Sequence, residues 1–143
     1  MKKIYTKKPS ETQDLAKQLA QKSNGGDIIL LEGDLGTGKT TFTKGFAMGL
    51  GIIEDEIVSP TFTLMQIYKI KNSKIKNLVH IDTYRLENED QLIEIGVEDY
   101  LGDENSVCII EWPEKISNLL KNKKTINLLI KHVDKNTREI EVT

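Results

Sequence analysis

A chain of 143 residues with 38% hydrophobic and 29% charged residues has the length and composition of one globular domain. Its formal net charge of −2 argues against tight non-specific binding to nucleic acid, which requires a basic surface. No apolar run is long enough to cross a bilayer, and the first ten residues lack the apolar segment of a secretory signal, so we expect a cytoplasmic protein with no membrane partner.

The first predicted elements flank a glycine-rich segment. A capping-box pair, Ser10 and Gln13, begins a run with apolar residues at helical spacing, which predicts a helix over residues 11–22. Residues 28–31 form a continuous apolar run of the length of a buried central strand. Residues 39–50 predict a second helix. The glycines lie between this strand and this helix.

Further strands and a third helix are predicted downstream. Residues 62–70 and 75–81 carry strand-forming side chains around a polar turn, which indicates a β-hairpin. Residues 89–100 predict a helix, with acidic residues near its start and apolar residues along it. Residues 107–110 predict another buried strand, and they include the single cysteine, Cys108, which we expect to be a buried thiol.

The end of the chain predicts a second hairpin. A loop and a short helix are expected in the segment EWPEKISNLL, and residues 125–133 and 137–142 flank the polar turn DKN. This order of elements predicts an α/β fold, a single domain over residues 1–143. We expect a mixed, mostly parallel central sheet that is flanked by helices, with β-hairpins.

The glycine-rich segment carries the most specific motif. Gly33, Gly38, Lys39 and Thr40 match the pattern G-x-x-x-x-G-K-[ST], with an additional glycine at Gly36, in the strand–loop–helix context that this pattern requires. The glycines let successive backbone N–H groups point at phosphate oxygens, and the helix adds its positive end. Lys39 would reach the β- and γ-phosphates, and the Thr40 hydroxyl would bind Mg²⁺. The sequence therefore predicts a P-loop NTPase domain.

Two carboxylates at predicted strand ends are candidates for the rest of the site. Asp82 ends the run LVHID and Glu111 ends the run VCIIE. Both could reach the phosphates, because ligand sites in α/β sheets lie beyond the carboxyl ends of parallel strands. An aspartate here is the usual partner of magnesium, whereas a glutamate is better suited to orient or deprotonate water or to bind the metal directly. The division of roles stays open, as does the alternative that either residue is a solvated acid.

Other residues near these motifs have alternative interpretations. Trp112, the only tryptophan, either covers a sheet edge or helps to form the site. Thr61 either closes a loop over the γ-phosphate or lies in a plain junction between a turn and a strand. His80 and His132 are interpreted as structural, because neither has partner ligands nearby in the sequence.

The identity of the nucleotide and its use are inferred from what the sequence lacks. Guanine-specific switches read the base with an Asn-Lys-x-Asp element, and the nearest approach, residues 122–125, ends in threonine, so ATP is favoured. Small-molecule kinases close an arginine-bearing lid over the phosphates, whereas this chain has only two arginines, Arg85 and Arg138, and no inserted lid. ATP hydrolysis coupled to a partner protein is therefore favoured. The alternatives are a P-loop small-molecule kinase and a non-hydrolysing, ATP-binding regulatory module.

Four segments in register, GDLGTGKTT, SPTFTL, HIDTYRL and EWPEK, resemble the TsaE (YjeE) family of bacterial ATPases, and the resemblance covers nearly the whole chain. It implies a role in forming N6-threonylcarbamoyladenosine at position 37 of tRNAs that read codons beginning with adenine. It also implies two partner proteins, TsaB and TsaD, with tRNA involved through their complex. The implied ATPase activity is weak in the isolated protein, and it regulates or resets the complex.

The resemblance also implies roles for individual residues. ATP binding is implied for residues of the glycine-rich segment, namely Gly33, Gly36, Thr37, Gly38, Lys39, Thr40 and Thr41. Catalytic roles are implied for Lys39, Asp82 and Glu111; Glu111 would serve Mg²⁺ together with Thr40, and Asp82 would assist hydrolysis. Thr12 is expected near the adenine. Candidates for a switch or for forming the site are Thr61, Arg85 and Trp112, the last of which belongs to the E-W-x-E motif.

Overall fold

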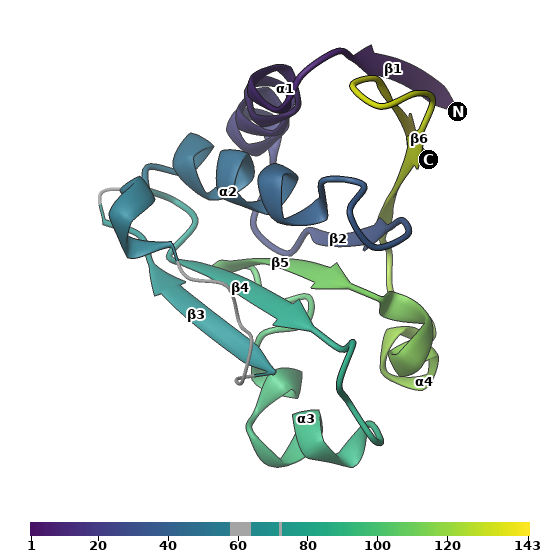
Figure 1. Ribbon diagram of the computed structural model, residues 1–143. Coiled ribbons are helices and arrows are strands. Elements are labelled where there is room, and N and C mark those ends of the chain that lie inside the picture. Colours follow the sequence, from purple (N-terminus) through teal and green to yellow (C-terminus); the bar gives the residue numbers. More distant parts are fainter. Residues whose placement is uncertain (58–63, 72) are drawn as a thin grey trace. The chain divides into compact units, whose positions relative to one another are not determined.

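The chain groups into two compact units. The first comprises Met1–Ser23, Leu31–Ser59 and Asn127–Thr143, and the second comprises Asn24–Leu30 and Pro60–Ile126. The computed structural model describes residues 1–57, 64–71 and 73–143 (Figure 1). Thr61 lies outside the described residues, and the single domain over residues 1–143 stays a prediction. In the described ranges, no helix has the length and apolar character that a membrane span requires.

The described residues form a seven-stranded sheet with the order β1-β7-β6-β2-β5-β4-β3. Strands β4 and β5 are parallel, whereas β3 with β4, β1 with β7, and β6 with β7 form antiparallel pairs. The predicted mixed α/β fold and both predicted hairpins are therefore confirmed, the first of them without residues 62–63, which lie outside the described residues. The strands are β1 (Lys2–Thr6), β2 (Ile28–Glu32), β3 (Met65–Lys69), β4 (Asn77–Asp82), β5 (Ser106–Glu111), β6 (Ile126–His132) and β7 (Arg138–Val142).

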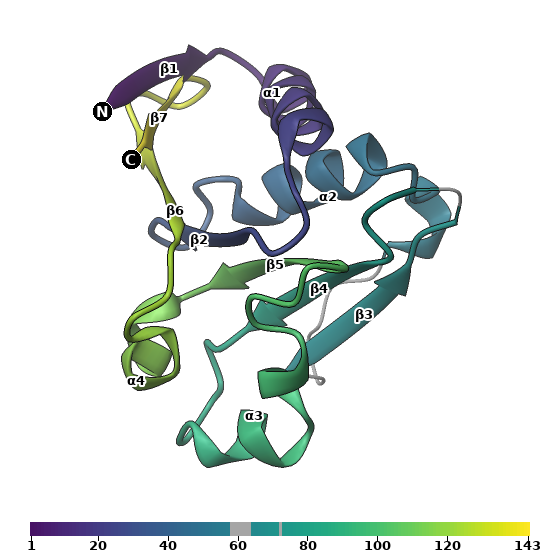
Figure 2. The same cartoon turned by 180° about the vertical axis from the view of Figure 1, so that it is seen from behind.

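Two helices of the first unit pack closely against each other. Helix α1 spans Pro9–Lys22 and α2 spans Lys39–Gly49, and they lie side by side in both views (Figure 1 and Figure 2). A Cβ atom on Gly45 would lie 2.5 Å from the carbonyl oxygen of Gln13, and one on Gly49 would lie 2.7 Å from that of Lys17. The missing side chains at these positions, one helical turn apart, let the two backbones approach. A 3₁₀ turn, η1 (Glu54–Glu56), follows.

Replacing Gly45 with alanine should lower the free energy of unfolding by about 1–3 kcal/mol, the usual cost of overpacking a core. Helix propensity alone would predict the opposite sign, because alanine is about 1 kcal/mol more favourable than glycine inside a helix. A loss of stability would therefore indicate the close approach of the two helices. Urea unfolding followed by circular dichroism measures the change. Lys44→Ala, on the same helix but outside the buried core, is the control and should stay within about 0.5 kcal/mol. A Gly45→Ala variant as stable as the wild type would contradict the close approach.

Helix α1 begins earlier than predicted, and the expected capping box is wrong. The N-cap is Lys8, which makes no capping hydrogen bond through its side chain, and Pro9 begins the first turn. Proline fits this place because its ring fixes a helical φ and the first turn has no acceptor for an N–H group. Ser10 therefore lies inside the helix. The Glu11 carboxylate accepts a hydrogen bond of 2.8 Å from the backbone N–H of Lys7.

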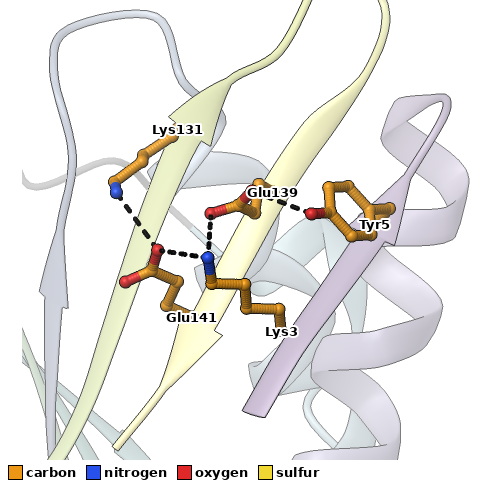
Figure 3. A network of polar contacts seen from close by, with 5 residues as sticks. All are labelled: Lys3, Tyr5, Lys131, Glu139 and Glu141. Atoms are coloured by element: carbon orange, nitrogen blue, oxygen red, sulfur yellow. Dashed lines mark hydrogen bonds and ion pairs between the residues drawn. The ribbon is translucent and has the colours of Figure 1, made fainter. Parts of the chain in front are cut away.

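The sequence-based prediction missed strand β1. The antiparallel register of β1 with β7 places Tyr5 opposite Glu139 and Lys3 opposite Glu141. On the other side of β7, Lys131 of β6 lies opposite Glu139 (Figure 3). The Tyr5 hydroxyl donates to Glu139 at 3.0 Å, which raises the pKa of the tyrosine, and Lys131 donates to Glu141 at 3.1 Å, which lowers the pKa of the glutamate. The Lys3 ammonium lies 4.0 Å from the Glu139 carboxylate and 3.8 Å from that of Glu141. Such exposed pairs add little to the free energy of unfolding, so their main effect is to favour this register of the strands.

The second unit has a core of aliphatic side chains. The side chains come from the start of β2, from β4 and β5, and from the segments that follow these strands. Its fully buried members include Val79, Ile81, Leu92, Val97, Cys108, Ile110 and Ile116. Cys108 is the buried thiol that was predicted, and burial raises its pKa to about 12, so the thiol stays protonated. The chain beyond β5 forms a 3₁₀ turn, η3 (Pro113–Ile116), and helix α4 (Ser117–Leu120), as expected for a loop and a short helix.

The predicted helix over residues 89–100 is wrong as one continuous element. Helix α3 spans only Asp90–Glu94, and a 3₁₀ turn, η2 (Val97–Asp99), follows it. Between them, Gly96 has a left-handed φ of 90°. A left-handed residue ends an α-helix, and glycine adopts this conformation without steric cost. Apolar residues on both sides of the break, Leu92 and Val97, are still fully buried.

Candidate functional site

The glycine-rich segment leads from strand β2 into helix α2. Gly36 and Gly38 have φ values of 79° and 105°, and Gly38 directly precedes the helix. Left-handed residues of this kind let a loop present successive N–H groups to one anion. A Cβ atom on Gly33 would lie 2.7 Å from the carbonyl oxygen of Ile130 and 2.7 Å from the Thr37 hydroxyl oxygen. The loop conformation therefore requires glycine at the places where the phosphate-binding motif has it.

Side chains of the loop hold its shape. The backbone N–H and the hydroxyl of Thr37 both donate to the carbonyl of Asp34, at 3.3 and 2.8 Å, and Thr37 is buried. Lys39, the first residue of α2, is only 6% exposed and donates from Nζ to the carbonyl of Gly33. The ammonium group is thus held at the loop rather than extended into solvent. Thr40 is exposed in the first turn of α2.

A cavity of about 280 Å³ lies beside this loop, within the first unit. Three segments that are distant in sequence line it, namely the loop with the start of α2, the start of α1, and the β6–β7 hairpin. The lining residues are Gly36, Thr37, Gly38 and Thr41, then Lys8, Pro9 and Thr12, then Lys135, Asn136 and Arg138. Three of these side chains are basic and none is acidic, so the lining favours an anionic ligand.

Arg138 connects the β6–β7 hairpin to the glycine-rich loop. Its Nε donates to the carbonyl of Thr37 at 3.1 Å, and its Nη1 donates to the carbonyls of Asp134, Lys135 and Thr137 at 3.2 to 3.3 Å. The Asp134 carboxylate in turn accepts hydrogen bonds from the N–H groups of Asn136 and Thr137, which lower its pKa. One guanidinium therefore fixes the hairpin turn and ties it to the loop.

Thr12 lies on the wall of this cavity, but its hydroxyl is already engaged. Its Oγ1 is 2.7 Å from Oγ1 of Thr6, and the residue is only 3% exposed. A buried hydroxyl pair satisfies both side chains without a ligand. Thr12 therefore shapes the cavity, and its contact with an adenine stays a prediction.

The two candidate carboxylates belong to the second unit, at the ends of β4 and β5. The parallel register pairs Asp82 with Glu111, so both side chains lie on the same face of the sheet. Asp82 is half-buried and accepts a hydrogen bond of 3.0 Å from the N–H of Tyr84. Glu111 is only 5% exposed, and its Oε2 lies 2.6 Å from Nε2 of His80. Glu111 is therefore a buried, paired carboxylate and not a solvated strand-end acid.

The chain after Glu111 turns sharply. Trp112 has a left-handed φ of 58°, and the Thr83 hydroxyl donates to the carbonyls of both Glu111 and Trp112. The ring of Trp112 lies 5.2 Å from that of Tyr84, over which the Lys115 ammonium lies at 5.7 Å. Trp112 thus packs against an exposed tyrosine directly beyond the carboxylates. Arg85, the residue after Tyr84, is exposed.

Comparison with known proteins decides the family. The model of the family described as "Threonylcarbamoyl adenosine biosynthesis protein TsaE" matches residues 6–140. This chain belongs to the TsaE family. A TsaE protein of Bacillus subtilis is 41% identical over 141 residues, and the alignment covers 99% of this chain and 84% of that protein. A TsaE protein of Nostoc is 40% identical over 149 residues, and the alignment covers 100% of this chain and 86% of that protein. The crystal structure of Bacillus subtilis YdiB aligns with a TM-score of 0.79 at 38% identity, covering 97% of this chain and 82% of that one.

Sequence reasoning missed several residues at the candidate TsaE sites. His80 was interpreted as structural because no partner ligand lies near it in the sequence, and the structure pairs it with Glu111, 31 residues away. The signal was the period of two in the motif HID, which places His80 on the same face as Asp82. Arg138 was noted only as one of two arginines, and the turn with Lys135 and Asn136 only as a turn. No local pattern indicated that this turn lines the cavity.

Proposed function

We propose that this protein is a Mg²⁺-dependent ATPase that takes part in forming N6-threonylcarbamoyladenosine at position 37 of tRNAs that read codons beginning with adenine. It acts in the cytoplasm with TsaB and TsaD and regulates or resets their complex, through which tRNA is involved. Membership in the TsaE family supports the pathway. The observation that carries the ATPase is the phosphate-binding loop at the start of α2, which borders a cavity with three basic lining residues.

The proposed nucleotide lies with its phosphates in the loop and its nucleoside in the cavity. Backbone N–H groups around Gly36 and Gly38, the start of α2 and the Lys39 ammonium would bind the phosphates. The cavity of about 280 Å³ is near the lower end of the volumes of small-molecule sites. Its walls at Thr12 and Asn136 would then face the base and ribose.

Mg²⁺ would be held by the Thr40 hydroxyl and the Glu111 carboxylate. Both offer oxygen atoms, the ligands that Mg²⁺ prefers, and the ion is usually bound by few side chains together with water and phosphates. Among the described residues, no group of three or more His, Cys, Asp or Glu could hold a metal by itself. When bound, Mg²⁺ neutralises charge on the phosphate oxygens during transfer. Asp82 would assist by orienting the attacking water.

Label transfer from ATP tests this function. The full chain is incubated with Mg²⁺ and ATP labelled at the γ-phosphate, alone and with purified TsaB, TsaD and tRNA. We expect the label in inorganic phosphate, slowly without partners and faster with them. Label in an organic acceptor would indicate a small-molecule kinase instead. Tight ATP binding without turnover in any mixture would indicate a regulatory module, and no acceleration by active partners would refute the coupled ATPase.

Replacing Arg138 with methionine should weaken ATP binding about 10-fold, or about 1.4 kcal/mol. The substitution keeps much of the side-chain length but removes the hydrogen bonds to Thr37 and to the hairpin turn. Isothermal titration calorimetry with a non-hydrolysable ATP analogue measures the affinity. Lys124→Met removes the same charge from an exposed position and is the control. Equal affinities for the two variants would show that the Arg138 contacts do not organise the site.

A further inference from the structure

The contact between His80 and Glu111 joins the most buried carboxylate of the proposed site to a side chain with no assigned role. Nε2 and Oε2 lie 2.6 Å apart, and the two side chains are only 4% and 6% exposed. The register of β4 and β5 produces the contact, because His80 and Asp82 share a face and Asp82 lies opposite Glu111. Two parallel strands thus bring together a histidine and a glutamate that no local sequence signal connects.

The burial of this pair makes the hydrogen bond a strong constraint. A hydrogen bond to a charged acceptor is shorter and stronger than one between neutral groups, and a buried carboxylate without a partner is costly. A free glutamate side chain also populates several rotamers. The contact with His80 restricts Glu111 to the rotamers that reach the imidazole ring. Meanwhile Thr83 fixes the Glu111 carbonyl through a hydrogen bond of 3.1 Å. The backbone and the carboxylate of Glu111 are therefore held independently.

The other ring nitrogen of His80 indicates how the proton is arranged. Nδ1 is buried and has no hydrogen-bond partner among the described residues. A proton on Nδ1 would create a buried N–H group without an acceptor. In free energy this costs more than leaving an unprotonated Nδ1 without a donor. The tautomer with its proton on Nε2 satisfies the contact with Glu111. His80 is thus a donor aimed at one carboxylate oxygen.

We propose that His80 is a positioning residue of the ATPase site, which holds the Glu111 carboxylate in its working orientation through Nε2. The catalytic consequence rests on the proposed function, whereas the hydrogen bond itself does not. Outer partners that orient a metal ligand typically change activity or metal affinity 10- to 100-fold when they are removed. A pair that only joined two strands would instead change stability alone.

Nuclear magnetic resonance of the imidazole nitrogens tests the hydrogen bond without any nucleotide. The chain has only two histidines, so His132, which is exposed, is an internal reference. We expect His80 in the Nε2–H tautomer, with a slowly exchanging proton that loses its protection in Glu111→Ala. An Nε2 proton of wild-type His80 that exchanges as fast as that of His132 would overturn the proposal, whatever the enzymatic activity.

Steady-state hydrolysis by the full chain with its partners tests the positioning role. His80→Leu should lower kcat about 10- to 100-fold with little change in KM. His80→Gln, which places an amide donor near the position of Nε2, should recover at least half of that loss on a logarithmic scale. His132→Gln is the matched control. Folded variants of His80 with normal kcat, or equal losses in the leucine and glutamine variants, would overturn the positioning role. Absence of hydrolysis by the wild type would instead refute the proposed function.

Discussion

Replacing Lys39 with alanine should weaken ATP binding by on the order of 100-fold, or about 3 kcal/mol. The reason is that the lysine places a positive charge directly at the loop, where its Nζ already contacts the Gly33 carbonyl. Each charge-assisted hydrogen bond to a phosphate contributes about 1.5–3 kcal/mol, and alanine can make none of them. Isothermal titration calorimetry with Mg²⁺ and a non-hydrolysable ATP analogue measures the loss.

Two comparisons separate binding from folding in this experiment. Lys44→Ala removes the same charge from the same helix, away from the loop, and should bind ATP as the wild type does. Thermal unfolding shows whether Lys39→Ala is folded at the temperature of titration. A folded Lys39→Ala variant with an affinity within about threefold of the wild type would mean that the lysine only braces the loop, because loss of even one charged contact exceeds that factor.

The parts that could be predicted from the sequence are those whose signal is local. The glycine-rich loop between β2 and α2 is one, because its conformation requires glycine at Gly33 and Gly38, which lie within a few residues of each other. The strand with Glu111 is another, because a buried strand reads as a continuous apolar run. The helix after β4 shows the limit of this reasoning. Its apolar residues are buried as expected, yet a single left-handed glycine, Gly96, divides it.

The parts that could not be predicted depend on partners far away in the chain. Strand β1 exists through its pairing with β7, and its residues carry no apolar alternation that would single them out. The cavity beside the loop needs Lys8 and Arg138, which lie at opposite ends of the sequence. The same holds for His80, whose partner belongs to another strand. Sequence patterns thus indicated the candidate site residues, whereas the contacts that hold these residues depend on the topology of the sheet.

Replacing Glu111 with glutamine should reduce kcat for ATP hydrolysis by about 100- to 1,000-fold, or about 3–4 kcal/mol, because a bound metal ion contributes several kcal/mol to transition-state stabilisation. Glutamine keeps the length of the side chain and an oxygen that can accept from His80, so the strand end stays intact. The negative charge is lost, and with it the proposed interaction with Mg²⁺. Affinity for ATP without Mg²⁺ should change little, since the phosphate loop is unaltered. Phosphate release and calorimetric titration measure the two effects.

Glu111→Ala should add a loss of stability to the same loss of kcat, because it leaves the buried donor of His80 without an acceptor at a cost of about 1–3 kcal/mol. The difference between the two variants therefore separates the charge of Glu111 from its structural hydrogen bond. Glu98→Gln, at an exposed position of the same unit, is the control for removing a carboxylate. Normal turnover by Glu111→Gln would show that the carboxylate is buried only to join β4 and β5, and hydrolysis would then depend on Asp82 alone.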